Sequence, residues 1–225
     1  MKIIAIGGGG FTHDVEPDLD DFCLSETKCD RPRMAFIGTA SGDDPLKIER
    51  FRTRFVDVAL SLVHLPMTLP AAQLAQKLEQ VDLVYVGGGD TEKMVSAWRQ
   101  AGWDDVLSKA CQSGVILAGV SAGAVCWFDT FLFSSSKGVM RSLPGLGLIP
   151  MGACTHYSSE PNRRAALHAA VTAKTMPTSV AIDDGVAVMF ENGNPTSIFT
   201  AKEGAGAYMV CWSPQGATEK TLSIE

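Results

Sequence analysis

Residues 115–128 read Val-Ile-Leu-Ala-Gly-Val-Ser-Ala-Gly-Ala-Val-Cys-Trp-Phe, and they carry more information about the fold than any other stretch. An apolar run typical of a buried strand, Val115–Ala118, leads into a helix-competent run, Ala122–Phe128. Between them stands Gly-x-Ser-x-Gly, centred on Ser121. On such a strand-to-helix turn the serine hydroxyl stands out above the sheet edge, and the flanking glycines avoid collisions with nearby backbone. The stretch predicts an exposed, candidate nucleophilic serine in an α/β protein.

The order of strand and helix recurs on the N-terminal side of this stretch. Short apolar runs predict buried strands at Lys2–Ile6, Met34–Ile37 and Val81–Val86. The predicted helices between them are Lys47–Val63, a short helix around Leu74 and Leu78, and Trp103–Cys111. Strands separated by helices of this length indicate a mostly parallel sheet with helices on both faces, which is a three-layer α/β fold.

The pattern changes after Pro150. A helix is predicted at Arg163–Val171, followed by short strands with tight turns between them. These strands are Ser179–Ile182, Val186–Phe190, Thr196–Thr200 and Ala207–Cys211. We interpret them as a strand-rich C-terminal edge on the same sheet. Since no linker, repeat or low-complexity segment divides the chain, we expect one domain over residues 1–225.

Composition narrows the classes of partner. The chain has 225 residues, 46% of them hydrophobic and 20% charged, with a net charge of −6, which does not favour nucleic acid or an acidic membrane surface. No apolar stretch is long enough to span a bilayer. The six cysteines show neither CxxC pairs nor zinc spacing, so we expect a reduced, cytoplasmic protein. We expect it to be a monomer or a small homo-oligomer.

A nucleophilic serine needs a base and a group that orients the base. Among four histidines the best candidate is His156, in a polar loop expected near the C-terminal sheet edge, although His13 also follows a glycine run. The orienting carboxylate is expected from Asp183 or Asp184, directly after a predicted strand. Ser121, rather than the nearby Cys126, occupies the turn, which disfavours a cysteine nucleophile.

Glycine runs supply the candidate binding loops. Gly87–Gly89 lies between a strand and a capped helix, where bare backbone N–H groups bind anions. One of these amides and that of Ala122, at a helix N-terminus, are candidate donors to an oxyanion. No glycine run matches a dinucleotide or phosphate-binding loop, so no cofactor is expected.

Charged residues outside these loops divide into two groups. The acidic stretch at residues 14–21 lacks the spacing of a calcium loop, so we interpret it as a solvated loop and expect no metal. Three arginines of the predicted helix Lys47–Val63, namely Arg50, Arg52 and Arg54, are expected to be solvated as well. Arg163 and Arg164 closely follow His156 and could clamp a substrate carboxylate, and Tyr157 is a further candidate substrate contact.

The ordered combination of these motifs resembles a known family. Val86–Thr91, Gly119–Ala124, Gly147–Pro150, His156 and Ala181–Gly185 together are similar to the peptidase E (aspartyl dipeptidase) and cyanophycinase family of serine peptidases. The resemblance covers nearly the whole chain. It implies a fold akin to class I glutamine amidotransferases, with the nucleophile on a strand-to-helix elbow.

The resemblance also implies roles for residues. Ser121 becomes the nucleophile, His156 the general base and Asp184 the residue that orients it, while the amides of Ala122 and of Gly88 or Gly89 form the oxyanion hole. The implied function is hydrolysis of small peptides, with a preference for an N-terminal aspartate. Two alternatives remain: a cyanophycinase-like hydrolase of β-Asp-Arg peptides, and a non-catalytic small-molecule binding module on the same fold.

Overall fold

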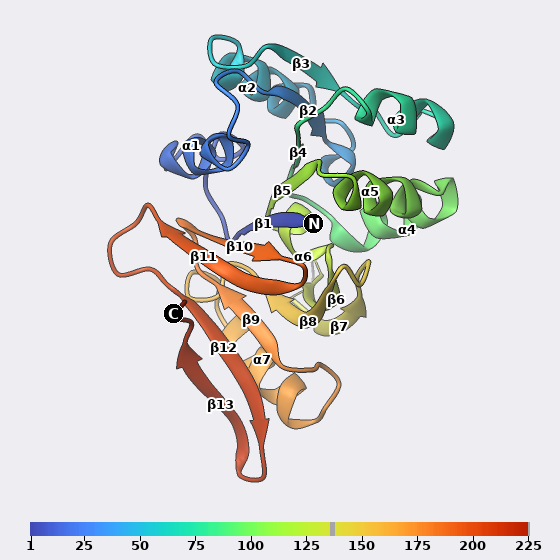
Figure 1. Cartoon of the computed structure of the whole chain (residues 1–225). Coiled ribbons are helices and arrows are strands. Elements are labelled where there is room, and N and C mark those ends of the chain that lie inside the picture. The colour runs from blue at the N-terminus through green and yellow to red at the C-terminus, as the bar shows by residue number, and fades with distance from the viewer. Residues whose placement is uncertain (136–137, 225) are drawn as a thin grey trace.

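The computed structural model describes residues 1–135 and 138–224, and a seven-stranded sheet forms its centre (Figure 1). In spatial order its strands are β11 (Asn194–Thr200), β10 (Val186–Glu191), β1 (Lys2–Ile6), β5 (Ile116–Val120), β4 (Leu83–Val86), β2 (Arg33–Ile37) and β3 (Ser61–His64). The strands β1, β5, β4, β2 and β3 run parallel to one another. Strand β10 pairs antiparallel with β1, and β11 pairs antiparallel with β10. The pairings Ile6 with Val120 and Val86 with Gly119 bring the carboxyl ends of β1, β4 and β5 to one edge.

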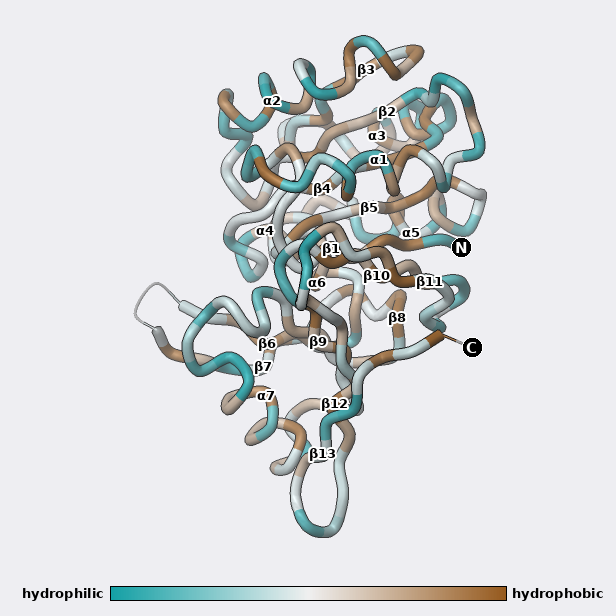
Figure 2. The backbone as a smooth tube through the Cα atoms, turned by 90° about the vertical axis from the view of Figure 1, so that its left-hand side faces the viewer, coloured by the Kyte–Doolittle hydropathy of each residue, from teal (hydrophilic) through white to brown (hydrophobic). Residues whose placement is uncertain are grey.

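Helices cover both faces of this sheet, which confirms the predicted α/β class. One face carries α3 (Ala71–Leu78), α4 (Thr91–Ala101) and α5 (Trp103–Gln112), and the other carries α1 (Asp18–Ser25) and α2 (Pro45–Phe55). Successive residues of a strand point to opposite faces, so in β1 Ile3 packs under the first group and Ile4 under the second. The central strands β4 and β5 are accordingly buried along their whole length, while the edge strands β3 and β11 are partly exposed. Hydrophilic residues are concentrated on the outer helices and loops (Figure 2).

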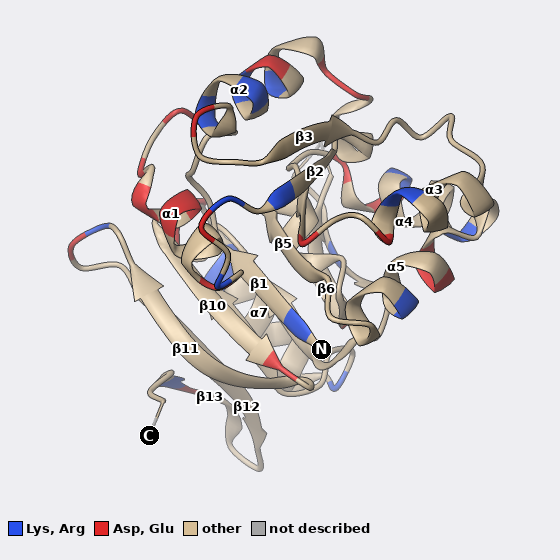
Figure 3. Ribbon diagram, turned by 45° about the horizontal axis from the view of Figure 1, so that its top comes forward, with Lys and Arg blue, Asp and Glu red and all other residues tan. Residues whose placement is uncertain are grey.

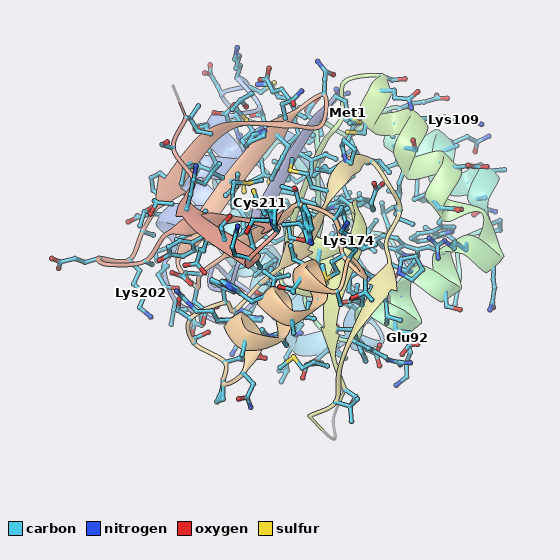
Figure 4. The ribbon with its side chains drawn as sticks, turned by 90° about the horizontal axis from the view of Figure 1, so that it is seen from below. Met1, Glu92, Lys109, Lys174, Lys202 and Cys211 are labelled. Carbon is cyan, nitrogen blue, oxygen red and sulfur yellow. The ribbon has the colours of Figure 1, made fainter. Side chains whose placement is uncertain are left out.

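A second, six-stranded sheet lies beside the first. In spatial order it contains β13 (Gly216–Thr221), β12 (Ala207–Ser213), β9 (Ser179–Ile182), β8 (Ile149–Cys154), β6 (Phe128–Ser134) and β7 (Met140–Pro144). Helix α7 (Arg163–Thr172) packs on it through Leu167 and Val171 (Figure 4). Residues of both sheets, such as Phe190 and Phe128, share one hydrophobic cluster.

The prediction that all C-terminal strands extend the first sheet is therefore wrong. Only β10 and β11 do so; β9 pairs in parallel with β8, and β12 pairs antiparallel with β9. The apolar character of a strand indicates that it is buried but does not identify its partner.

Two predicted helices are shorter than expected. The helix predicted at Lys47–Val63 ends with α2 at Phe55, and the chain returns as β3, which pairs in parallel with β2. Leu62, near the end of the predicted helix, lies in this strand. The helix after Ser121 is also short, because α6 (Ala122–Val125) gives way to β6 at Phe128.

The acidic stretch at residues 14–21 is not a solvated loop throughout. Its second half begins α1, which lies next to the basic residues of α2 (Figure 3). The Asp20 side chain is fully buried and accepts hydrogen bonds from Phe11 N (2.9 Å) and from Arg54 Nε (3.3 Å). Burial raises the pKa of Asp20 to about 6, against the opposing effect of Arg54. Arg54 is thus a half-buried ion-pair partner of the interior Asp20 rather than a fully solvated residue.

A membrane span was not expected. Within residues 1–135 and 138–224, the structure has no helix of the length and apolar character that crossing a bilayer requires.

Candidate active site

Ser121 stands on a sharp turn between β5 and α6. Its backbone has φ 56° and ψ −113°, a conformation that residues other than glycine rarely adopt. The flanking glycines permit the turn: a Cβ on Gly119 would lie 2.1 Å from the carbonyl oxygen of Gly123, and a Cβ on Gly123 would lie 2.2 Å from that of Val86. The local sequence therefore dictates the strained turn on which the serine hydroxyl is displayed.

Two further side chains form a hydrogen-bonded chain with this serine. His156 Nε2 lies 2.8 Å from Ser121 Oγ, and His156 Nδ1 lies 2.6 Å from Asp184 Oδ1. The His156 N–H that donates to Asp184 is the main reason why the pKa of that carboxyl is lowered to about 2, although burial opposes the shift. Since an ionised carboxylate only accepts, Nδ1 carries the proton and Nε2 is left to accept from the Ser121 hydroxyl. This is the geometry of an activated nucleophile.

The two adjacent aspartates have different surroundings. Asp183 is buried, and its carboxylate accepts from Ser158 N (3.0 Å), Gly206 N (3.0 Å) and Tyr208 Oη (3.3 Å). It ties together the loops on either side, whereas Asp184 faces the imidazole. Of the two candidates, the structure brings Asp184 to His156.

Gly8 is a residue of this site that the sequence reasoning did not single out. A Cβ on Gly8 would lie 2.1 Å from Asp184 Oδ1 and 3.0 Å from His156 Cε1. Its carbonyl oxygen accepts from Gly185 N at 2.9 Å. The signal available in the sequence was position, because the first glycine run, Gly7–Gly10, follows β1 and reaches the same sheet edge.

Three backbone amides lie close to Ser121. A Cβ on Gly88 would be 3.2 Å from the Ser121 Cβ, and Gly89 and Ala122 line a cavity together with Ser121. Across residues 1–135 and 138–224, the N–H groups of Gly88, Gly89 and Ala122 have no protein acceptor. Unpaired N–H groups at this position are what an oxyanion requires.

The cavity beside Ser121 is small, with a volume of about 50 Å³. Its lining consists of Gly89, Thr91, Ser121, Ala122, Val125, Leu132, Phe133, Ser134, Thr155 and Arg163. A cavity of roughly 10–15 Å³ by this measure holds one water molecule, so a small group fits here. A larger cavity, of about 610 Å³, lies between α1 and α2 and does not include Ser121.

Of the two candidate arginines, the structure brings only Arg163 to this cavity. Its side chain is buried, with Nε donating to Glu160 Oε2 (2.6 Å) and Nη1 to the Leu132 carbonyl (3.4 Å). No acceptor for Arg163 Nη2 occurs in the part of the chain that the structure describes. The guanidinium therefore retains donors for a ligand.

Arg164 and Tyr157, the other predicted substrate contacts, point away from the cavity. Arg164 Nη1 donates to Glu219 Oε1 (2.8 Å), and the buried Tyr157 donates its hydroxyl to Glu219 Oε2 (2.5 Å). The Arg164 guanidinium also stacks on the Tyr157 ring at 4.8 Å from its centroid. Arg164 thus joins α7 to β13, and Tyr157 joins the loop after β8 to β13; neither lines the cavity.

The remaining histidines do not contact the serine. His13 is exposed, with its ring centroid 6.4 Å from that of His156. His64 lies 3.0 Å from Asp43, and His168 lies 3.0 Å from Glu219. In the chain as described, no group of three His, Cys, Asp or Glu side chains is arranged to hold a metal ion.

The lowered pKa of Asp184 predicts how stability depends on pH. The folded carboxylate holds its proton less tightly than the unfolded one, so its contribution, roughly 2 kcal/mol, is complete above about pH 4 and is lost as the pH falls towards 2. We expect Asp184→Asn to lower the free energy of unfolding at neutral pH but much less at about pH 2. Urea unfolding of both proteins across this range checks the prediction, and a pH-independent difference would contradict it.

Comparison with known proteins gives consistent results. The model of a family described as Peptidase family S51 matches residues 3–198. The chain is 36% identical to an uncharacterized peptidase of Bacillus subtilis (strain 168), YgaJ, over 228 residues that cover 100% of this chain and 98% of the relative. Identity to Peptidase E of Streptomyces coelicolor is 27% over 129 residues, which cover 56% of this chain and 51% of that protein.

A solved structure supports the fold. The crystal structure of a peptidase from an acI-B1 Actinobacterium superposes with a TM-score of 0.74 and covers 99% of this chain and 94% of its own. The sequence identity is 19%, so the similarity concerns the fold alone.

Proposed function

The chain belongs to peptidase family S51, and we propose that within this family it is a serine dipeptidase that uses Ser121 as its nucleophile. The observation that carries the proposal is the chain of two hydrogen bonds from Asp184 through His156 to Ser121, at 2.6 and 2.8 Å. This geometry is a means of removing the serine proton during attack on a carbonyl carbon.

The proposed reaction has two stages. His156 Nε2 takes the Ser121 proton as Oγ attacks the scissile carbonyl, and the amides of Ala122 and of Gly88 or Gly89 stabilise the oxyanion. His156 then gives the proton to the leaving amine, which departs and leaves an acyl-enzyme on Ser121. A water molecule, deprotonated by the same nitrogen, hydrolyses this ester and regenerates the serine. Throughout, Asp184 stabilises the imidazolium and keeps its orientation.

We propose that the preferred substrate has an N-terminal aspartate. Two features support this preference: the cavity beside Ser121 is small, about 50 Å³, and the buried Arg163 side chain lines it. An arginine recognises a carboxylate with charge-assisted hydrogen bonds, which are stronger than those between neutral groups. Glu160 forms an ion pair with Arg163, but the Glu160 side chain is 44% exposed, so water weakens the attraction between the two charges.

A dipeptide panel tests the function and the preference together. We expect wild-type protein to hydrolyse Asp-Leu faster than Glu-Leu, Ala-Leu or β-Asp-Leu. In Arg163→Met we expect kcat/KM for Asp-Leu to fall about 10- to 100-fold, the effect of losing a hydrogen bond to a charged group, with Ala-Leu hardly affected. Arg164→Met is the matched control, since the neighbouring arginine pairs with Glu219.

Three outcomes would contradict parts of this proposal. Equal rates across the panel would remove the aspartyl preference and leave the serine mechanism intact. An equal loss for all dipeptides in Arg163→Met would make Arg163 a structural residue. No turnover of any peptide, with no labelling of Ser121 by an organophosphorus probe, would overturn the catalytic function and favour a binding module.

A further inference from the structure

Lys47 reaches the candidate oxyanion loop from a distant part of the chain. It lies in the first turn of α2, whose N-terminus is capped by Asp44 through its bond with Leu46 N (2.9 Å). The half-buried side chain extends to the loop after β4, where Nζ donates to the carbonyl oxygen of Gly88 at 2.8 Å. Nothing in the reaction outlined above accounts for this contact, which joins residues 41 positions apart.

The contact fixes the direction of a peptide group. In a trans peptide the C=O of one residue and the N–H of the next point in opposite directions. A lysine that holds the Gly88 carbonyl on one side therefore directs the Gly89 N–H to the other side. Gly89 lines the cavity of about 50 Å³ together with Ser121 and Ala122, and its N–H is without an acceptor in the described chain.

This peptide group needs to be held because glycines flank it. Gly89 has φ 151°, and a Cβ there would lie 2.1 Å from the Ala40 carbonyl oxygen, so only glycine fits. Glycine also lets a peptide group rotate at little steric cost. The peptide group that follows Gly89 is restrained by Asp90 N, which donates to Ala40 O at 2.8 Å. The peptide group that precedes Gly89 is restrained by Lys47 through the Gly88 carbonyl. A rotated peptide would turn the Gly88 oxygen towards the developing negative charge.

We propose that Lys47 is a positioning residue for the reaction: it holds the Gly88–Gly89 peptide in the orientation that offers the Gly89 N–H to the oxyanion. The proposal rests on the proposed function of Ser121 as a nucleophile. A charged donor makes a stronger hydrogen bond than a neutral one, and it polarises the peptide so that the N–H donates more strongly. Burial is the main cause that lowers the pKa of Lys47; Asp44 raises this pKa and Arg50 lowers it. The bond to the Gly88 carbonyl replaces part of the hydration that the ammonium group loses on burial.

The test compares three variants. Lys47→Met keeps the length of the side chain but removes the donor, and Lys47→Arg keeps a charged donor. Lys93→Met is the matched control: Lys93 is 85% exposed and pairs with Asp90, directly after Gly89, so the variant removes a charge near the same loop without touching the Gly88 carbonyl.

The expected results separate positioning from substrate binding. Removal of an oxyanion donor lowers kcat about 10²- to 10³-fold, so a donor that is only misdirected should lose about 10- to 100-fold in Lys47→Met. We expect KM to change little, Lys47→Arg to recover most of the loss and Lys93→Met to behave as wild type. In Lys47→Met, a peptide aldehyde that forms a tetrahedral adduct should bind more weakly by a factor similar to the loss in kcat. Asp-Leu should bind Ser121→Ala with and without Lys47→Met equally well.

Several results would overturn the proposal. An unchanged kcat in Lys47→Met would show that the loop holds its own orientation. A rise in KM with no loss in kcat would make Lys47 a substrate contact, and an equal loss in Lys93→Met would indicate a general effect of charge. If wild-type protein has no peptidase activity and Ser121 is not labelled, the failure lies with the proposed function and not with Lys47.

Discussion

Ser121→Ala is expected to lower kcat for dipeptides by about 10⁴-fold or more, which is the range for loss of the nucleophile in a serine-histidine-carboxylate site. The substitution removes only Oγ, which lies 2.8 Å from His156 Nε2, and leaves the backbone turn and the cavity in place. Dipeptide binding should therefore persist, and calorimetric titration of the variant with Asp-Leu measures it. The loss should appear in kcat and not in KM.

The control for this variant is Cys126→Ala. Cys126 is the nearest thiol in the chain after the elbow, but it is fully buried and its thiol contacts the Gly123 carbonyl oxygen. Burial raises the pKa of Cys126, so the thiol is a poor nucleophile. We expect this variant to retain kcat. Wild-type turnover by Ser121→Ala, or loss of turnover only in Cys126→Ala, would remove Ser121 from the mechanism.

The elbow could be predicted because its constraints are local. A buried strand, two glycines around a serine and a helix start within 14 residues fix the turn, and each glycine excludes a clash with backbone only a few residues or one strand away. His156 and Asp184 were found differently, as polar residues in loops after strands. Because β8 and β9 run parallel, His156 and Asp184 converge at the same edge of the second sheet although they are 28 positions apart. Ser121 follows a strand of the first sheet, 35 positions before His156, so its contact with the histidine depends on how the two sheets pack.

The rest of the site depends on contacts that leave no local pattern. Lys47 belongs to an ordinary amphipathic helix, and only the packing of α2 on the sheet brings its ammonium group to Gly88. Arg163 and Arg164 are adjacent in sequence and equivalent by composition. In the first turn of α7, Arg163 lines the cavity whereas Arg164 contacts Glu219. Glu219 belongs to β13, a strand that was not predicted from the sequence.

The second sheet was missed for the same reason. Its parallel pairs β6–β8 and β8–β9 join segments separated by β7 and by α7, so the pairing is decided by long-range packing. Because β8 ends at Cys154, two residues before His156, this unpredicted sheet is what places the histidine.

Gly8→Ala is expected to lower kcat about 10³-fold without unfolding the protein. The added methyl would stand 2.1 Å from Asp184 Oδ1, a distance that no real contact allows, so the carboxylate has to move away from His156. The obstacle is the end of a side chain, which can rotate. The neighbouring Gly7 is different, because there a Cβ would meet the Asp183 carbonyl oxygen at 2.1 Å and backbone would have to shift. We therefore expect Gly7→Ala to lose stability and Gly8→Ala to lose activity.

A double-mutant cycle identifies the cause of the lost activity. Loss of the orienting carboxylate in Asp184→Ala is expected to cost about 10⁴-fold in kcat. If Gly8→Ala acts only by displacing that carboxylate, then adding it to Asp184→Ala should cost nothing more, since the methyl then occupies the vacated space. The low-field proton resonance of His156 Nδ1–H should disappear in both single variants. Two results would contradict this explanation: losses in kcat that multiply in the double variant, or a resonance that persists in Gly8→Ala. Either would mean that the added methyl acts directly on the His156 ring, because a Cβ on Gly8 would lie 3.0 Å from His156 Cε1.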